Sequence, residues 1–297
     1  MVIVPREFGQ VLGDAMNGLV AVWKTLLLPA LVVSIPVGIA TIVVFSTTGG
    51  ADFLDLVLNS PDDLQLLPEE VVQELAEPFY LAAGIAILLQ IIAGVFVALA
   101  SHRAVAAQIR GESMTSGEVT RLALRRYPTG LGATILIVVA VAALIGLGTV
   151  VWLVPALSVG TPNAASQLVA PLLLFVLLGP GIWAGVSASM TTSAVAIEQG
   201  GVLTSIRRSM RLVRGRWWPT AGFLLLVGLL GGIAIQLIQL IALPLAAVGG
   251  GGAALGIASA LGVLAQGLLV AAIAAMYTHW YIDLRARQEV LSTETLG

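Results

Sequence analysis

The feature that most constrains this sequence is a series of long apolar runs, with every basic residue confined to alternate connections between them. The runs lie near 25–46, 79–101, 129–155, 169–196, 219–247 and 255–281. Each is long enough for the roughly 20 residues with which a helix crosses the hydrocarbon layer. They lack the alternation that is typical of barrel strands, and lipid cannot satisfy open backbone groups. The sequence therefore predicts an all-α, polytopic membrane protein with six transmembrane helices.

The distribution of charge predicts how the chain is threaded. All fourteen Lys and Arg residues lie before the first run, between the second and third, between the fourth and fifth, or after the sixth. The other connections contain no Lys or Arg, and the first of them, 47–78, carries eight carboxylates. Because cytoplasmic loops are enriched in Lys and Arg, both termini are expected in the cytoplasm. We expect a multi-pass protein of the cytoplasmic (plasma) membrane with an acidic outer loop over 47–78, including a short surface helix over 68–77.

Composition limits the chemistry that is open to this chain. Hydrophobic residues make up 58% and charged residues 10% of the sequence, which is far from the range of soluble domains. There is no cysteine, and the two histidines, His102 and His279, are too few for a histidine metal cluster. No nucleophile elbow, phosphate-binding loop, zinc motif or dinucleotide fingerprint is present. We therefore expect no metal, no cofactor, no nucleic-acid partner and no enzymatic activity, with both histidines at lipid headgroups.

An amphipathic segment precedes each helix that runs outward. The three segments end in aromatic residues before the membrane, at Trp23, at Tyr127 and at Trp217 with Trp218. Such rings settle at the headgroup level, and amphipathic helices of this kind lie in the plane of the interface. The sequence thus predicts three transmembrane hairpins, each preceded by a cytoplasmic amphipathic elbow helix. We interpret this as a single membrane domain, 1–297, with a threefold repeat over 5–112, 113–200 and 201–289.

The arginines of the second and third elbows are the predicted contacts with lipid headgroups. In the third elbow, an apolar stripe from Leu203 to Trp217 opposes the arginines at helical spacing. Each basic residue near an anionic leaflet adds about 1 kcal/mol to membrane attachment. Glu198 and the arginines after it can form a gate or a phosphate site, but an interfacial helix in which Glu198 pairs with one arginine is favoured. Membrane lipids, mainly anionic, are thus the expected partners of Arg207, Arg208, Arg211, Arg214, Arg216, Arg121 and Arg125.

Two short stretches resemble a known group of proteins. The first, from Ala196 to Trp218, reads AIEQGGVLTSIRRSMRLVRGRWW. It resembles an elbow found in uncharacterised bacterial membrane proteins, a group that includes the YciC-like proteins and the membrane domain attached to some glycerophosphodiester phosphodiesterases. The second, Tyr281–Glu289, resembles the Tyr-x-Asp-Leu-Arg-x-Arg-x-Glu terminus of the same group. The matching elbow positions are Glu198, Ile206, Arg208, Ser209, Leu212, Gly215 and Trp217.

The resemblance implies a six-helix frame over nearly the whole chain and little catalytic function. In that group the phosphodiesterase activity belongs to a separate soluble domain, and this sequence has no long polar stretch for one. Four residues from the two stretches are expected to pack together as a latch that joins the last helix to the third elbow. They are Glu198, Tyr281, Asp283 and Arg285. Substrate binding is the alternative role for this set.

The predicted spans contain few polar residues. No Asp, Glu, Lys or Arg lies well inside any span, and intramembrane charges usually mark ion or proton coupling, so active transport is disfavoured. Gln90 and Gln266 fall near mid-membrane. Gly179, Pro180 and Gly181 predict a kink or break in the fourth helix. Together these five residues are the candidates for a cavity among the hairpins.

Two functions remain open, with a membrane enzyme as a distant third. The leading hypothesis is an accessory or scaffold protein that organises lipids or a membrane protein partner at the inner leaflet. The alternative is a passive transporter or lipid carrier with a cavity between the hairpins. A polar cavity that reaches mid-bilayer favours the carrier, whereas a packed apolar centre with an exposed groove favours the scaffold.

Overall fold

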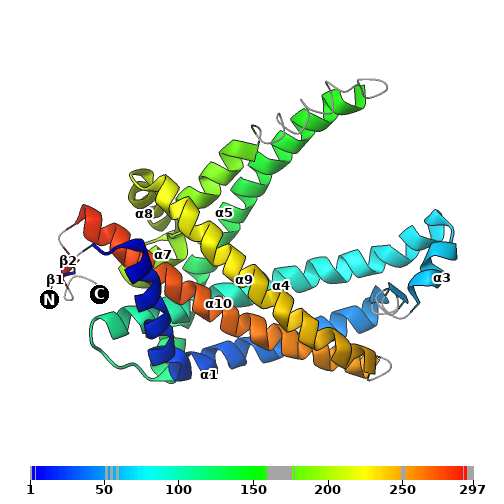
Figure 1. The fold of residues 1–297 in the computed structure, drawn as a ribbon, viewed down its shortest axis with the longest axis horizontal. Coiled ribbons are helices and arrows are strands. Elements are labelled where there is room, and N and C mark those ends of the chain that lie inside the picture. Colours follow the sequence, from blue (N-terminus) through cyan, green and yellow to red (C-terminus); the bar gives the residue numbers. More distant parts are fainter. Residues whose placement is uncertain are drawn as a thin grey trace.

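The protein is a bundle of long helices with one small pair of strands near the chain ends (Figure 1). The computed structural model describes residues 2–3, 5–50, 53, 56–57, 60–158, 176, 178–248, 252–289 and 291–292. Its elements are β1 (Val2–Ile3), α1 (Phe8–Thr48), α3 (Pro61–Leu66), α4 (Glu69–Ile109), α5 (Ser116–Ser158), α7 (Thr191–Glu198), α8 (Val202–Arg214), α9 (Trp217–Val248), α10 (Gly252–Gln288) and β2 (Leu291–Ser292). Residues 178–188 are also helical. Strands β1 and β2 pair antiparallel, with Val2 opposite Ser292.

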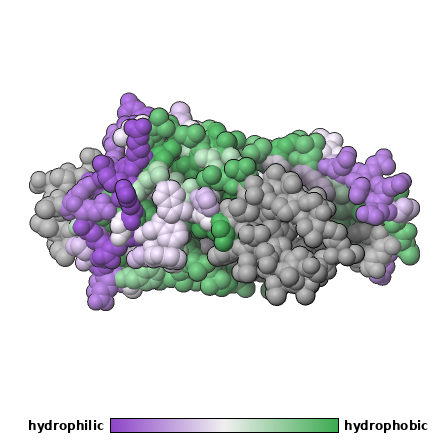
Figure 2. Space-filling view, turned by 90° about the horizontal axis from the view of Figure 1, so that it is seen from above, coloured by the Kyte–Doolittle hydropathy of each residue, from purple (hydrophilic) through white to green (hydrophobic). Residues whose placement is uncertain are grey.

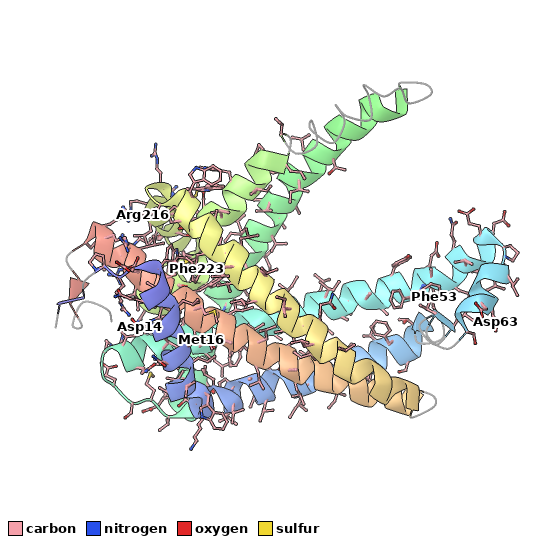
Figure 3. All side chains as sticks on the ribbon, viewed as in Figure 1. Asp14, Met16, Phe53, Asp63, Arg216 and Phe223 are labelled. Atoms are coloured by element: carbon pink, nitrogen blue, oxygen red, sulfur yellow. The ribbon has the colours of Figure 1, made fainter. Side chains whose placement is uncertain are left out.

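The two ends of the molecule differ in charge, and an apolar band separates them. Helix α8 and the β1–β2 pair lie at one end, and the acidic helix α3 lies at the other (Figure 1). Figure 3 places Asp14 and Arg216 at the first end and Asp63 at the second. On the face seen in Figure 2, hydrophilic residues gather towards both ends, with hydrophobic residues between them. We call the end that carries α8 the basic end and the end that carries α3 the acidic end.

Among the described residues, five helices are long and apolar enough to cross a membrane. They cover Phe8–Thr48, Glu69–Ile109, Ser116–Leu147, Trp217–Ile238 and Gly262–Gln288. These helices coincide with five of the six predicted spans. Of the remaining run, residues 169–175 and 177 lie outside the described part of the chain. The fold is therefore all-helical in its architecture, and the chain is a multi-pass membrane protein.

The first two predicted elbows are not separate helices. Helix α1 runs without interruption from Phe8 to Thr48 and bends sharply, so that Asp14 and Met16 lie on a short arm (Figures 1 and 3). Pro29 inside α1 lacks the N–H that would bond one turn back, which accounts for a bend in an otherwise continuous helix. Helix α5 likewise continues from Ser116 through the predicted elbow into the span. Only α8, which corresponds to the third elbow, is a helix of its own.

The acidic segment over 47–78 contains more helix than the sequence suggested. The surface helix expected over 68–77 is instead the beginning of α4, which starts at Glu69 and continues unbroken to Ile109. Glu69 and Glu70 stand in its first turn, where carboxylates oppose the positive end of the helix dipole. A helix of 41 residues is longer than the hydrocarbon layer requires, so its acidic first turns can project from the membrane.

The buried core is concentrated towards the basic end. Helix α10 packs against α1, α4, α9 and the short helices α7 and α8. One apolar cluster joins α1, α4, α5, α7 and α10 around Leu99 and Ala275. A second joins α8, α9 and α10 around Leu212, Phe223 and Tyr281. Elsewhere many apolar side chains of α5 and α9 remain exposed, as expected for helices surrounded by lipid tails, which are as apolar as leucine.

Candidate functional site

A break in the fourth run shapes the basic end. Helical residues 178–188 are followed by a turn at Ser189–Met190, and α7 then continues to Glu198. The fully buried Ser209 of α8 fills this break: its hydroxyl donates to the carbonyl of Ser187 at 2.8 Å and accepts from the N–H of Met190 at 3.1 Å. A single side chain thus satisfies backbone groups on both sides of the interruption. Of the kink or break predicted at 179–181, no break is present there, because residues 178–188 are helical.

An ionic cluster joins α7, α8 and α10. We name it the Glu198 cluster and define it as Glu198, Arg208, Tyr281, Arg285 and Glu289. The Nε of Arg208 donates to both carboxylate oxygens of Glu198, at 2.9 and 3.0 Å, and its terminal nitrogen pairs with Glu289. Arg285 Nε lies 3.3 Å from an oxygen of each of these two carboxylates. The hydroxyl of Tyr281 donates to Glu198.

Arg208 and Glu289 each favour the charged form of the other. Burial alone would lower the pKa of Arg208, but the hydrogen bonds that it donates to Glu198 and Glu289 outweigh that effect and raise its pKa. Burial would likewise raise the pKa of Glu289, but its bonds with Arg208 and Arg285 hold that pKa below its ordinary value. The ion pair between Arg208 and Glu289 therefore ties the end of α10 to α8.

Asp283 belongs to a second network, which holds the N-terminal arm. Its carboxylate accepts from the backbone N–H of Arg6 at 2.8 Å and from Arg287 Nε at 2.6 Å. Arg287 also donates to the carbonyl of Arg6, and the Arg6 side chain pairs with Asp14. In a helix, residues four apart share a face and residues two apart do not. Tyr281 and Arg285 therefore face Glu198, whereas Asp283 and Arg287 face the arm.

The residues of the predicted latch are thus divided between two networks. The structure brings Glu198, Tyr281 and Arg285 together, and it places Asp283 with the N-terminal arm. Sequence reasoning did not find Glu289 or Ser209 as parts of this junction. The signal for Glu289 was available, because it lies four residues after Arg285 on the same face of α10.

Both histidines are buried in the protein, contrary to the expected headgroup contacts. Thr278 donates its hydroxyl hydrogen to the carbonyl of Ala274 and therefore accepts from His102 Nδ1–H at 2.8 Å. The other ring nitrogen lies 3.3 Å from the hydroxyl of Thr192. Among the described residues, no carboxylate hydrogen-bonds to His102. We interpret this group as a polar junction that fixes α4, α7 and α10.

The predicted lipid-contact arginines fall into different environments. Arg207, Arg211 and Arg214 project from the exposed face of α8, and Arg121 and Arg125 are exposed on α5. None of these five forms an ion pair with a described residue. Two others differ. Arg208 points into the Glu198 cluster, and Arg216 lines a hollow of about 540 Å³ beside Trp280 and Arg287.

The predicted apolar stripe of α8 packs on the protein only in part. Val213 of the stripe is buried together with Ser205, Ser209 and Leu212, whereas Leu203 and Met210 are exposed. Small serines allow the close approach that the break at 189–190 requires. Leu203 and Met210 therefore remain free to enter lipid beside the arginines.

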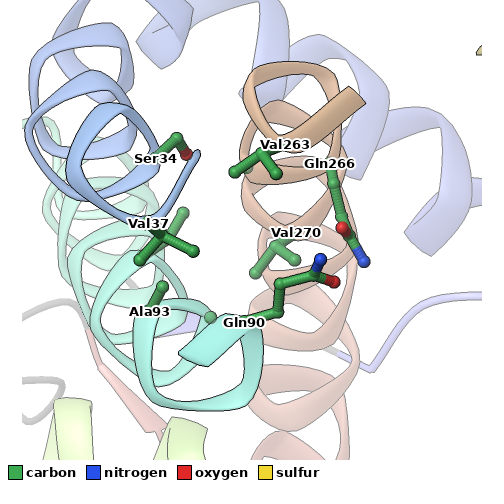
Figure 4. Close-up of a pocket in the computed structure, with 10 residues that line it drawn as sticks. Ser34, Val37, Gln90, Ala93, Val263, Gln266 and Val270 are labelled. Atoms are coloured by element: carbon green, nitrogen blue, oxygen red, sulfur yellow. The ribbon is translucent and has the colours of Figure 1, made fainter. Parts of the chain in front are cut away.

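The predicted cavity residues do not all meet. Gln90 and Gln266 line a cavity of about 40 Å³ between α1, α4 and α10, together with Ser34 (Figure 4). Gly179 and Pro180 do not line it, and Gly181 lies against α5, where a Cβ would come within 2.8 Å of Ile145. This cavity thus contains two of the five predicted residues, and Gly181 allows close packing of its helix against α5.

A helical, multi-pass membrane protein with an ionic junction at its basic end is the class that these features define. The chain belongs to the family described as "Domain of unknown function (DUF7847)", which matches residues 25–284. No curated protein and no solved structure matches the chain.

Proposed function

We propose that this protein is a non-enzymatic component of the cytoplasmic membrane that organises lipids or a membrane protein partner at the inner leaflet. In this proposal six spans form three hairpins, both termini are cytoplasmic, and α8 lies in the interface as an elbow. The observation that carries it is the exposed arginine face of α8, formed by Arg207, Arg211 and Arg214 on a helix whose opposite face is fixed to the bundle.

The attachment of α8 makes its arginines a rigid surface. Ser209 bonds to the helix break, Arg208 joins the Glu198 cluster, and the side chain of Gln288 donates to the carbonyl of Leu212 at 2.8 Å. A helix held in this way loses little further freedom when its arginines bind phosphate groups. Leu203 and the adjacent Trp218, which is 80% exposed, supply the apolar contacts that interfacial helices use.

Within the described part of the chain, the small size of the cavity at Gln90 and Gln266 supports a scaffold over a carrier. A volume of about 40 Å³ is room for only one or two water molecules, whereas sites for larger ligands span roughly 300–1,000 Å³. A larger groove, of about 680 Å³, lies instead on the outer face of α9 along Gly228, Gly232 and Gln236. No atom of the described residues lies within 4 Å of a Cβ placed at either glycine. Glycines four residues apart are the spacing with which a partner helix approaches closely.

The arginine face can be tested by a triple substitution. The Arg207→Gln/Arg211→Gln/Arg214→Gln protein should retain less anionic phospholipid after mild extraction, measured by native mass spectrometry. The matched control replaces the same three residues by lysine, which keeps the charge and should keep most of the lipid. Equal lipid retention in the glutamine variant and the unmodified protein would rule out the arginine face as the attachment site.

The proposed orientation has a direct test, because the chain contains no cysteine. A single cysteine introduced by Asp63→Cys should react with a membrane-impermeant maleimide on intact cells. One introduced by Gly117→Cys should react only after the membrane is permeabilised. The reverse pattern would overturn the orientation and, with it, the inner-leaflet role.

We also propose kinship with the membrane domains of the YciC-like group. Both quoted stretches, Ala196–Trp218 and Tyr281–Glu289, supply residues to the Glu198 cluster. A shared structural junction explains why these two separated stretches would resemble that group together. The kinship adds no catalytic role.

A further inference from the structure

One buried arginine has no visible partner. Arg103 of α4 is 7% exposed, and its Nε is buried without a hydrogen-bond acceptor. Its guanidinium makes neither an ion pair nor a hydrogen bond with any residue in the described part of the chain. Arginine stays protonated in proteins, so this side chain cannot escape the cost of burial by losing its proton. Unpaired buried charges are strongly unfavourable.

The surroundings of Arg103 add positive charge. Arg103 lies seven positions after Phe96 and seven positions before Arg110, the C-cap of α4, so all three lie on one face of this helix. Phe96 packs edge-on against Tyr127 with ring centroids 5.9 Å apart, which places this face towards α5. Arg110 and Arg126 both lie close enough to repel Arg103 electrostatically.

The available acceptors do not neutralise this group. Arg126 of α5 donates to the backbone carbonyl and the side-chain oxygen of Gln199, at 2.9 and 2.8 Å, and both of these acceptors are uncharged. Arg110 pairs with the exposed Glu112 at 2.8 Å. Among the described residues, Arg103 and Arg126 thus have no carboxylate partner.

We propose that Arg103, Arg110 and Arg126 form a binding site for a phosphate-class anion at the junction of α4, α5 and the end of α7. Guanidinium groups bind phosphate oxygens through paired, charge-assisted hydrogen bonds, and three of them can surround one tetrahedral group. The anion gives the buried Arg103 the counter-charge that it otherwise lacks. The site is separate from the exposed arginines of α8, because it is built on α4 and α5.

The same chemistry can come from a lipid headgroup or from a free phosphate, and two arms of one experiment separate them. The protein is reconstituted in nanodiscs of phosphatidylcholine, and its thermal midpoint is followed against inorganic phosphate at matched ionic strength with chloride. In the second arm, phosphatidic acid replaces part of the lipid and no phosphate is added. A rise of the thermal midpoint in the first arm identifies free phosphate as the bound anion. A rise in the second arm alone identifies a lipid headgroup. Either rise supports the proposed site.

Substitutions decide whether the rise comes from this site. Arg126→Gln should weaken the apparent affinity for the stabilising anion about tenfold, as expected from losing a charge-assisted hydrogen bond. Arg125→Gln, its exposed neighbour on α5, is the matched control and should keep the response of the unmodified protein. Arg103→Met should abolish the response; if that variant does not fold, Arg126→Gln against Arg125→Gln still decides. No stabilisation in either arm, or an equal response from both glutamine variants, would overturn the proposal.

Discussion

Replacing Arg208 by glutamine should loosen the attachment of α8 to the end of α10. The Arg208 guanidinium is 13% exposed and holds two carboxylates, those of Glu198 and Glu289. Hydrogen bonds to charged groups contribute about 1.5–3 kcal/mol each when buried. Because these carboxylates are 26% and 33% exposed, solvent screening places each contribution near the lower limit of that range.

Arg285 reduces the loss of stability in this variant, because it approaches the carboxylates of both Glu198 and Glu289 and remains in place. We therefore expect Arg208→Gln to lower the free energy of unfolding by about 2 kcal/mol. The assay is equilibrium unfolding in mixed micelles, with helix content followed by circular dichroism. The control is Arg207→Gln, whose exposed side chain should change the same quantity by less than about 0.5 kcal/mol.

A double-substitution cycle isolates the interaction itself. Combining Arg208→Gln with Glu289→Gln should cost less than the sum of the single changes, by about 1 kcal/mol, because the two residues are in contact. If Arg208→Gln unfolds as readily as Arg207→Gln and the cycle shows strict additivity, the ionic junction does not hold α8 in place.

Three further outcomes are expected. The lowered pKa of Glu289 means that its charged carboxylate stabilises the fold at pH values above the ordinary pKa of 4.5. This stabilisation is lost as the pH falls through the pKa that Glu289 has in the folded protein. Between pH 7 and pH 3, the thermal midpoint should therefore fall less steeply in Glu289→Gln than in the unmodified protein. Gly267→Ala should destabilise the bundle by about 1–3 kcal/mol, because its Cβ would come within 2.2 Å of Ser34 Oγ. Adding Ser34→Ala should restore most of the lost stability. Gly262→Ala should be tolerated, because its Cβ meets no atom of the described residues within 4 Å. Ser209→Ala should cost about 1–3 kcal/mol in chemical unfolding because it leaves a buried backbone donor and acceptor unpaired, and no change would show that water replaces the hydroxyl.

The spans could be predicted because their signal is local. Long apolar runs located the five long helices α1, α4, α5, α9 and α10, whereas residues 169–175 and 177 of the sixth run lie outside the described chain. Helix boundaries were harder to place. Helices α1 and α4 continued through Lys24 and through Glu77, although the polarity of the sequence changes at both positions. Polarity reports the surroundings of a helix, and a helix does not end merely because its surroundings change.

The contacts that build the site depend on long-range packing, which one sequence does not display. Ser209 looks like a small residue within an amphipathic helix, and its bonds to Ser187 and Met190 require a break that lies about twenty residues earlier. Gly179–Gly181 carried the stronger sequence signal for a break, yet the helix continues through them. The division between Asp283 and Tyr281 was different. Helical spacing alone was sufficient to predict that these two side chains face opposite ways.

We propose that this protein organises partners at the inner leaflet and does not carry a lipid inside the bundle. One measurement tests this proposal most directly. Native mass spectrometry would be performed on the protein extracted together with its surrounding membrane, without detergent. We expect a stoichiometric second membrane protein, with anionic phospholipid retained by the unmodified chain. A lone chain that holds one defined lipid class, and retains it after the arginine face of α8 is replaced by glutamine, would contradict the proposed role and favour a lipid carrier.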